Sequence, residues 1–169
     1  MKRMKSFMTM MMAAVAIVLG VSSCSSDDDE PEVPAAAQVV GNYTGPEVIM
    51  VMNEESSNET KTYAFAKVSD SSIDMTIPAS GESGMMMIPA LTVKNIPLVK
   101  SGKSIIGSIS KYDGTVINAA GAEKNFTITN LLVSFEDVPK GKAVAVTFSL
   151  KYGAMPMDMV TTFTGERNK

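Results

Sequence analysis

The feature that most constrains the fold is the pattern of the chain after Gln38. Short runs of β-branched residues and methionine alternate there with clusters of Gly, Asn, Asp, Ser and Pro. No window repeats its apolar residues with the period of a helix. Turn-forming clusters at such short intervals are typical of antiparallel strands joined by tight connections. We expect strands near 38–44, 47–53, 61–68, 72–77, 85–94, 103–112, 115–118, 124–136, 143–152 and 157–165.

The expected strand at 143–152 alternates most regularly, with apolar side chains such as Phe148 on one face and small or polar ones on the other. This pattern predicts a half-buried antiparallel strand. The preceding strand changes phase, because Ile128 and Leu131, three positions apart, both fall in its apolar series. Since strand side chains alternate with a period of two, the change requires one extra residue. We therefore predict a β-bulge near Asn130.

Two connections carry turn sequences. Residues 112–115 contain Asp113-Gly114, which supplies the positive φ angles of a tight hairpin. Residues 139–142 (Pro-Lys-Gly-Lys) separate two strongly apolar segments.

Eight to ten strands in one domain, residues 38–169, predict an all-β fold, either a single antiparallel up-and-down barrel or a β-sandwich. The bulge favours the barrel, because bulges let a sheet curl and closure removes exposed edges.

The first 23 residues have the layout of a secretory signal peptide. A basic start, 1–5, precedes an apolar run, 7–21, that is short for a membrane span. The run ends in Val-Ser-Ser before Cys24, which resembles the lipobox of bacterial lipoproteins. In that family the cysteine is acylated and becomes the mature N-terminus. Because Cys24 is the only cysteine in the chain, we expect lipidation there; the alternative is ordinary cleavage with Cys24 incidental.

Residues 24–37 then predict a tether. The acidic segment 25–30 resembles the export tag of surface lipoproteins in Bacteroidetes-type bacteria, and the alternative is a solvated spacer. Residues 31–37 combine two prolines with small side chains, which favours extended chain. We expect lipid anchoring in the outer membrane with exposure at the cell surface, while anchoring in the inner leaflet stays open.

Three short motifs in the body resemble a known family. They are Val-Gly-Asn-Tyr-Thr-Gly at 40–45, Leu-Thr-Val-Lys-Asn-Ile at 91–96 and Thr-Phe-Thr-Gly at 162–165. Together, across 38–167, they resemble the opening, internal and terminal motifs of calycin-like β-barrel lipoproteins. The resemblance implies a lipocalin-like barrel whose first and last strands meet. It implies little about function, because most members lack an assigned role, and the chain lacks the first-strand tryptophan of true lipocalins.

Composition excludes several functions. Without histidine, the chain has no Ser-His or Cys-His catalysis and no His-ligated metal. Three of the 15 basic residues precede Asp27, whereas all 18 acidic residues lie at or after it. The remainder is net negative, which argues against nucleic acid as a partner. The acidic pairs Glu54-Glu55 and Glu136-Asp137 lie beside expected turns, where solvated acids are usual. We therefore predict a protein that is not an enzyme and has no cofactor, catalytic residue or metal.

Methionine is the unusual signal. Met155, Met157 and Met159 have the spacing of one strand face and also of thioether sites for Cu(I). Met50 and Met52 have the same spacing on an early strand, which a closed barrel would bring near the last one. Three interpretations are open: core filling, a ligand pocket and a soft-metal site, the last weakened by the lack of His. The expected lining of a ligand pocket is Met50, Met52, Phe148, Met155, Met157, Met159 and Phe163.

The leading hypothesis from the sequence is binding of a small apolar or amphipathic ligand in the barrel cavity. The alternative is a solid-cored module that binds a protein or glycan partner through its loops, with an exposed apolar patch around 85–88. A cavity of a few hundred cubic ångströms would favour the first. A filled core would favour the second.

Overall fold

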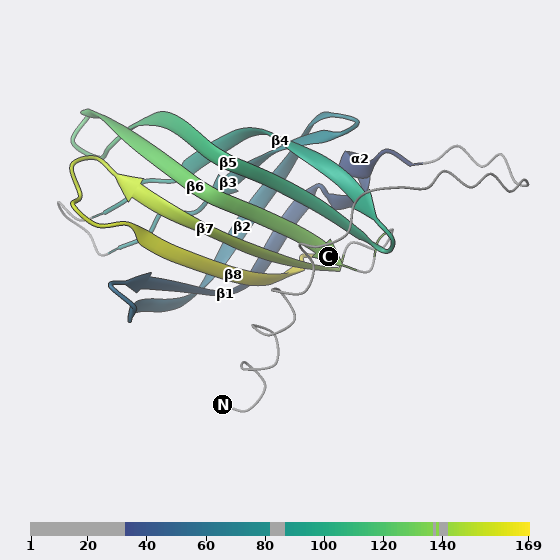
Figure 1. Ribbon diagram of the computed structural model, residues 1–169, viewed down its shortest axis with the longest axis horizontal. Coiled ribbons are helices and arrows are strands. Elements are labelled where there is room, and N and C mark those ends of the chain that lie inside the picture. Colours follow the sequence, from purple (N-terminus) through teal and green to yellow (C-terminus); the bar gives the residue numbers. More distant parts are fainter. Residues whose placement is uncertain (1–32, 82–86, 137, 139–141) are drawn as a thin grey trace, which may run out of the picture. The chain divides into compact units, whose positions relative to one another are not determined.

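The computed structural model describes residues 33–81, 87–136, 138 and 142–169. In this part of the chain each strand pairs antiparallel with the next, and the first pairs with the last, which closes a barrel (Figure 1). The predicted up-and-down barrel is confirmed, and the β-sandwich is wrong. The strands are β1 (Gly41–Val51), β2 (Glu54–Ser69), β3 (Ser72–Ile77), β4 (Leu91–Ser101), β5 (Ser104–Ile117), β6 (Glu123–Glu136), β7 (Ala143–Tyr152) and β8 (Met159–Arg167).

The hairpin predicted at 112–115 is wrong. Asp113 and Gly114 lie inside β5, opposite Thr127 and Phe126 of β6. Their side chains fit this pairing, because the Thr127 hydroxyl donates to Asp113 Oδ1 at 2.7 Å. A Cβ on Gly114 would lie 2.5 Å from Cζ of Phe126. The glycine therefore makes room for an aromatic ring on the neighbouring strand, and the expected strands 103–112 and 115–118 are one.

The first two expected strands are also one, since β1 runs without interruption to Val51. The connection to β2 consists of Met52 and Asn53, whose φ angles are 54° and 66°. Positive φ at both central residues is the requirement of a type I′ hairpin turn. The sequence prediction extended a strand through these residues because Met52 carries no turn signal.

The bulge predicted in β6 is confirmed. The register between β6 and β7 shifts between Thr129 and Leu132, and Asn130 has φ 54°. Ile128 and Leu131 are both buried, so the extra residue returns the apolar series to the inside. The turn expected at 139–142 falls in the connection between β6 and β7, but residues 139–141 lie outside the described residues.

Two strands begin later in the structure than the sequence predicts. The strand expected at 85–94 is β4, which begins at Leu91, and Ile88 makes a separate bridge to Ser80. The strand expected at 157–165 is β8, which begins at Met159. Both shifts lengthen the connections at one end of the barrel.

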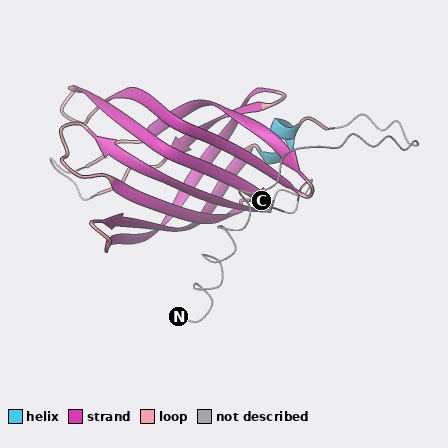
Figure 2. Ribbon diagram, in the orientation of Figure 1, coloured by secondary structure: helices cyan, strands magenta, loops and turns pink. Residues whose placement is uncertain are grey.

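A short helix, α2 (Ala35–Val39), covers the other end, which we call the closed end (Figure 2). Its Ala36 and Val39 are fully buried. Tyr43 Oη donates to the carbonyl oxygen of Val39 at 3.0 Å, and Arg167 donates to that of Val40. The expected extended chain through residue 37 and strand from residue 38 are therefore replaced here by a helix. In the described part of the chain, no helix has the length and apolar content needed to cross a membrane.

Aromatic side chains fill the barrel next to α2. Tyr43 meets the ring of Phe65 edge-on at 5.4 Å, and Phe65 meets Phe135 at 5.0 Å. Tyr63 stacks on Phe163 with 4.1 Å between ring centroids. Such pairs contribute stabilisation in addition to that from the apolar area that they bury.

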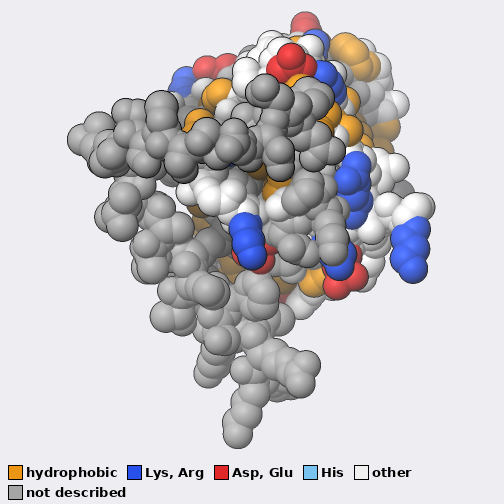
Figure 3. Space-filling view, turned by 90° about the vertical axis from the view of Figure 1, so that its right-hand side faces the viewer, with side chains coloured by type: hydrophobic (Ala, Val, Ile, Leu, Met, Phe, Trp, Pro, Cys, Tyr) orange, Lys and Arg blue, Asp and Glu red, His pale blue; other side chains and the backbone are white. Residues whose placement is uncertain are grey.

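In the view onto the closed end, charged side chains of both signs are scattered among uncharged ones (Figure 3).

Candidate functional site

The end of the barrel opposite α2, which we call the open end, carries the longer connections. Because the strands run up and down, every second connection lies there, namely residues 52–53, 78–90, 118–122 and 153–158. No described helix covers this end (Figure 1).

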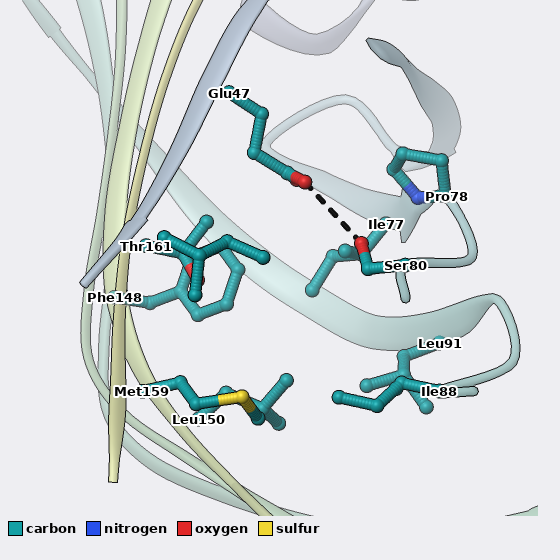
Figure 4. A pocket seen from close by; sticks show the side chains of 11 residues that line it. Glu47, Ile77, Pro78, Ser80, Ile88, Leu91, Phe148, Leu150, Met159 and Thr161 are labelled. Carbon is teal, nitrogen blue, oxygen red and sulfur yellow. Dashed lines mark hydrogen bonds between the residues drawn. The ribbon is translucent and has the colours of Figure 1, made fainter. Parts of the chain in front are cut away.

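A pocket lies just inside this end (Figure 4). Strands β1, β7 and β8 form one side of it, and the β3–β4 connection lies across from them. Its walls are largely apolar. We call it the open-end pocket, and its lining consists of Glu47, Ile49, Ile77, Pro78, Ser80, Ile88, Leu91, Phe148, Leu150, Met159 and Thr161.

The open-end pocket is nearly filled by its own side chains. Its cavity volume is about 10 Å³, which is about the space that one water molecule requires. The open-end pocket therefore falls far short of the few hundred cubic ångströms that a drug-sized ligand requires. Ile88 contributes to the filling, because its side chain is 7% exposed and belongs to the core.

Glu47 is the charged side chain in this apolar lining. It is 1% exposed. Its Oε2 accepts a hydrogen bond of 2.5 Å from the Tyr63 hydroxyl. Its Oε1 accepts one of 3.2 Å from the Ser80 hydroxyl (Figure 4). Strands β1 and β2 and the β3–β4 connection thus meet at one carboxyl group. Burial of a carboxyl group is costly unless hydrogen bonds or an opposite charge compensate.

The hydroxyl of Tyr63 stays protonated in this setting. Burial, the negative charge of Glu47 and the hydrogen bond to Glu47 together hold the pKa of Tyr63 well above its usual value. Its ring is fixed by the stack on Phe163. Tyr63 is therefore a fixed hydrogen-bond donor that holds the carboxyl group in place.

Among the described residues, no lysine or arginine forms an ion pair with Glu47. The ion pairs found there lie elsewhere on the surface, as between Lys61 and Glu59 at 2.7 Å and between Lys111 and Asp113 at 2.9 Å. The carboxyl group is therefore held by two hydroxyl groups alone in the part of the chain that the structure describes.

Three of the residues predicted to line a ligand pocket lie in the interior. Phe148 and Met159 line the open-end pocket, and Phe163 is buried deeper, under Tyr63. Met155 is partly buried and packs against the core from the β7–β8 connection. The structure therefore brings this part of the predicted set together.

The other three predicted lining residues lie outside. Met50 is the register partner of Val160, which is 43% exposed, whereas the inward residues of β1 lie on the other face. Met52 is 76% exposed in the β1–β2 turn, and Met157 is 41% exposed before β8 begins. The predicted single methionine wall is wrong, because Met157 lies outside the strand whose alternation the prediction assumed.

The same placement separates the methionines of the possible copper motif, since Met159 is buried and Met157 is exposed. The described residues contain no group of three or more His, Cys, Asp and Glu side chains suited to a metal ion. The expected apolar patch around 85–88 is only partly described: Ile88 is buried and Met87 half-buried, and residues 85 and 86 lie outside the described residues.

Sequence reasoning missed Glu47, Tyr63 and Ser80. A signal for Glu47 existed, because strict alternation from Tyr43 through Ile49 puts Glu47 on the inward face. We interpreted 38–44 and 47–53 as separate strands, and that interpretation broke the phase. No local signal brings Ser80 to Glu47, since the two residues lie 33 positions apart.

Comparison with known proteins identifies a family and a solved structure that are similar to this chain. The model of a family described as the calycin-like β-barrel domain matches residues 39–166. A crystal structure of a presumed outer membrane protein from Bacteroides fragilis superposes with a TM-score of 0.60 at 18% identity. The match covers 80% of this chain and 53% of that protein, so this chain spans about half its length. No curated protein matches the chain.

Proposed function

The chain belongs to the calycin-like β-barrel domain family, and from this premise we propose that it is a non-enzymatic binding protein, lipid-anchored at the bacterial outer membrane. It binds a small amphipathic molecule at the open end of the barrel. The observation that carries this proposal is the open-end pocket, in which apolar walls surround one buried carboxyl group, Glu47. Apolar walls with few polar groups are typical of small-molecule sites.

The chain direction supports the position of the site. The described residues begin at Val33, next to α2 at the closed end. A tether from a lipidated Cys24 would therefore join the barrel at the closed end, and the pocket opens at the opposite one. Cys24 and the acidic segment 25–30 lie outside the described residues. The presumed outer membrane protein with the same fold is consistent with this location.

Binding requires space that Ile88 now fills. We expect the apolar part of the ligand to take the place of the Ile88 side chain. Met159 and Leu91, which line the same pocket, would then contact the ligand. Ile88 belongs to the β3–β4 connection and is joined to Ser80 by two backbone hydrogen bonds of 3.0 and 2.9 Å. Shortening this side chain creates an apolar cavity of the kind that binds small hydrophobic molecules.

The test compares 1-octanol binding to residues 25–169, which lack the lipidated Cys24, and to the Ile88→Ala variant of the same chain by calorimetry. Room for about two more methylene groups, each contributing about 0.8 kcal/mol, corresponds to roughly tenfold tighter binding by the variant. Val160→Ala, which shortens an exposed side chain on β8, is the matched control and leaves the affinity unchanged. If neither wild type nor Ile88→Ala binds 1-octanol, the binding proposal fails.

Anchoring has its own test. Cys24→Ala should move the protein from the membrane fraction of the source bacterium to the soluble fraction. A variant that still fractionates with membranes would contradict the lipid anchor.

A second function, recognition of a protein or glycan partner by the loops, is favoured by one observation. The interior is nearly full, whereas Met52, Met157 and Val160 are exposed at or near the open end. Native mass spectrometry of the chain from the source bacterium separates the two functions. A bound mass of a few hundred daltons supports the ligand, and a bare chain supports the loop-mediated function.

A further inference from the structure

We propose that Glu47 makes the open-end pocket selective for an amphipathic amine, whose ammonium group binds the buried carboxylate while its apolar chain lies among the pocket walls. This inference rests on the proposed function and names the chemical class of its ligand.

The geometry leaves acceptor capacity on Glu47. A carboxylate offers about four lone-pair positions on its two oxygens. Each oxygen accepts one hydrogen bond from a neutral hydroxyl, that of Tyr63 on Oε2 and that of Ser80 on Oε1. The carboxyl group projects into the pocket toward Ser80 (Figure 4). A donor that enters the pocket can therefore bind Glu47 without displacing Tyr63.

The charge balance favours a cationic donor. Within the described residues Glu47 forms no ion pair, so its negative charge is compensated by hydroxyl groups only. An ammonium group in hydrogen-bond contact with a carboxylate forms a charge-assisted bond, roughly twice as strong as a neutral one. A buried carboxylate also repels an anionic head group, because little water screens the two charges. Fatty acids are thus expected to bind worst.

The walls favour an apolar chain attached to that amine. Ile49, Leu150 and Met159 lie toward the mouth on β1, β7 and β8, and each lines the pocket. The described lining contains no second charged side chain. The site therefore combines one point of charge recognition with an otherwise apolar surface, which fits a molecule with a single cationic head.

The experiment uses three eight-carbon probes that differ only in the head group: octylamine, 1-octanol and octanoate. Their affinities for residues 25–169 are measured by calorimetry at pH 7, where an alkylamine is protonated. We expect octylamine to bind at least tenfold more tightly than 1-octanol, and octanoate to bind most weakly. Octylamine and 1-octanol of equal affinity would overturn the inference but leave the proposed function intact. No binding of any probe, to wild type or to Ile88→Ala, would overturn both.

Two variants test whether Glu47 is the source of the preference for octylamine over 1-octanol. Glu47→Gln keeps the shape and still accepts from Tyr63 through its amide oxygen, so the preference for octylamine over 1-octanol should be lost. Glu54→Gln, on an exposed β2 residue at the same end of the barrel, removes the same charge outside the pocket and should keep the preference. A preference that survives in Glu47→Gln overturns the inference.

A third variant covers the case in which Glu47→Gln does not fold. Tyr63→Phe retains the stack on Phe163 and the carboxyl group but removes one hydroxyl donor. Because the freed oxygen then lacks a partner, the preference for octylamine should rise several-fold. An unchanged or smaller preference in this variant contradicts the role of Glu47.

Discussion

The hydroxyl of Tyr63 on β2 donates a 2.5 Å hydrogen bond to Oε2 of Glu47 on β1, inside the barrel and away from water. The two residues are not direct register partners, since Tyr43 is the partner of Tyr63 and Glu59 that of Glu47. The side chains of Glu47 and Tyr63 therefore meet diagonally across the β1–β2 pair. This pair connects the aromatic core with the open-end pocket.

The first prediction concerns alkaline stability. Burial raises the pKa of Tyr63 above the usual value of about 10, and Glu47 adds to the effect; burial also raises the pKa of Tyr43. Above about pH 10 these tyrosines ionise in the unfolded chain but not in the folded one. Their contribution is thus complete below pH 10 and is lost as the pH rises, by about 1.4 kcal/mol per pH unit for Tyr63.

The measurement is the free energy of unfolding from urea titrations followed by circular dichroism between pH 8 and 11. Tyr63→Phe should reduce the decline above pH 10 by the share of one tyrosine. A decline of the same slope in wild type and Tyr63→Phe would show that Tyr63 ionises as readily in the folded state as in the unfolded one.

The second prediction contrasts two methionines two positions apart. Met157→Glu should change the free energy of unfolding by no more than about 0.5 kcal/mol, because Met157 is 41% exposed. Met159→Glu should destabilise by more than about 3 kcal/mol, because it buries a second carboxylate near Glu47. Chemical denaturation of both variants measures the difference. Equal losses would mean that Met157 is also part of the core.

The third prediction tests the bulge in β6. Asn130 has φ 54°, a conformation that asparagine and glycine tolerate and β-branched residues do not. Asn130→Val should lower the melting temperature by an amount that corresponds to about 1–2 kcal/mol, whereas Asn130→Gly should be nearly neutral. Asn125→Val, at an exposed position of the same strand, is the control and should change little. A tolerated Asn130→Val would argue against the bulge.

The fourth prediction tests the closure of the barrel between β1 and β8. A Cβ at Gly45 would lie 2.1 Å from the carbonyl oxygen of Thr164, which is backbone and cannot rotate away. Gly45→Ala should therefore force the two strands apart and cost about 3 kcal/mol or more. Asn42→Ala, on an exposed residue of β1, is the matched control. Thermal denaturation compares them, and similar melting temperatures would contradict this close approach.

The sequence predicted the features that depend on short stretches of chain. Alternation in β7 and the phase change around Asn130 are local, since a strand side chain points to one face or the other with a period of two. Those predictions are confirmed, as is the closed antiparallel barrel. The Asp-Gly turn failed because its local signal was overruled by pairing with Phe126 on another strand.

Only the tertiary structure decided what occupies the interior. Alternation from Tyr43 puts Glu47 on the inward face of β1, but the side chains that it meets there, Tyr63 and Ser80, lie 16 and 33 positions away in the chain. The volume left in the pocket depends on side chains from five separate segments, including Ile88, that the sequence gives no means to place together. Side-chain alternation is set within a strand, but register and packing are set between strands. The site depends on register and packing, so the sequence alone does not determine it.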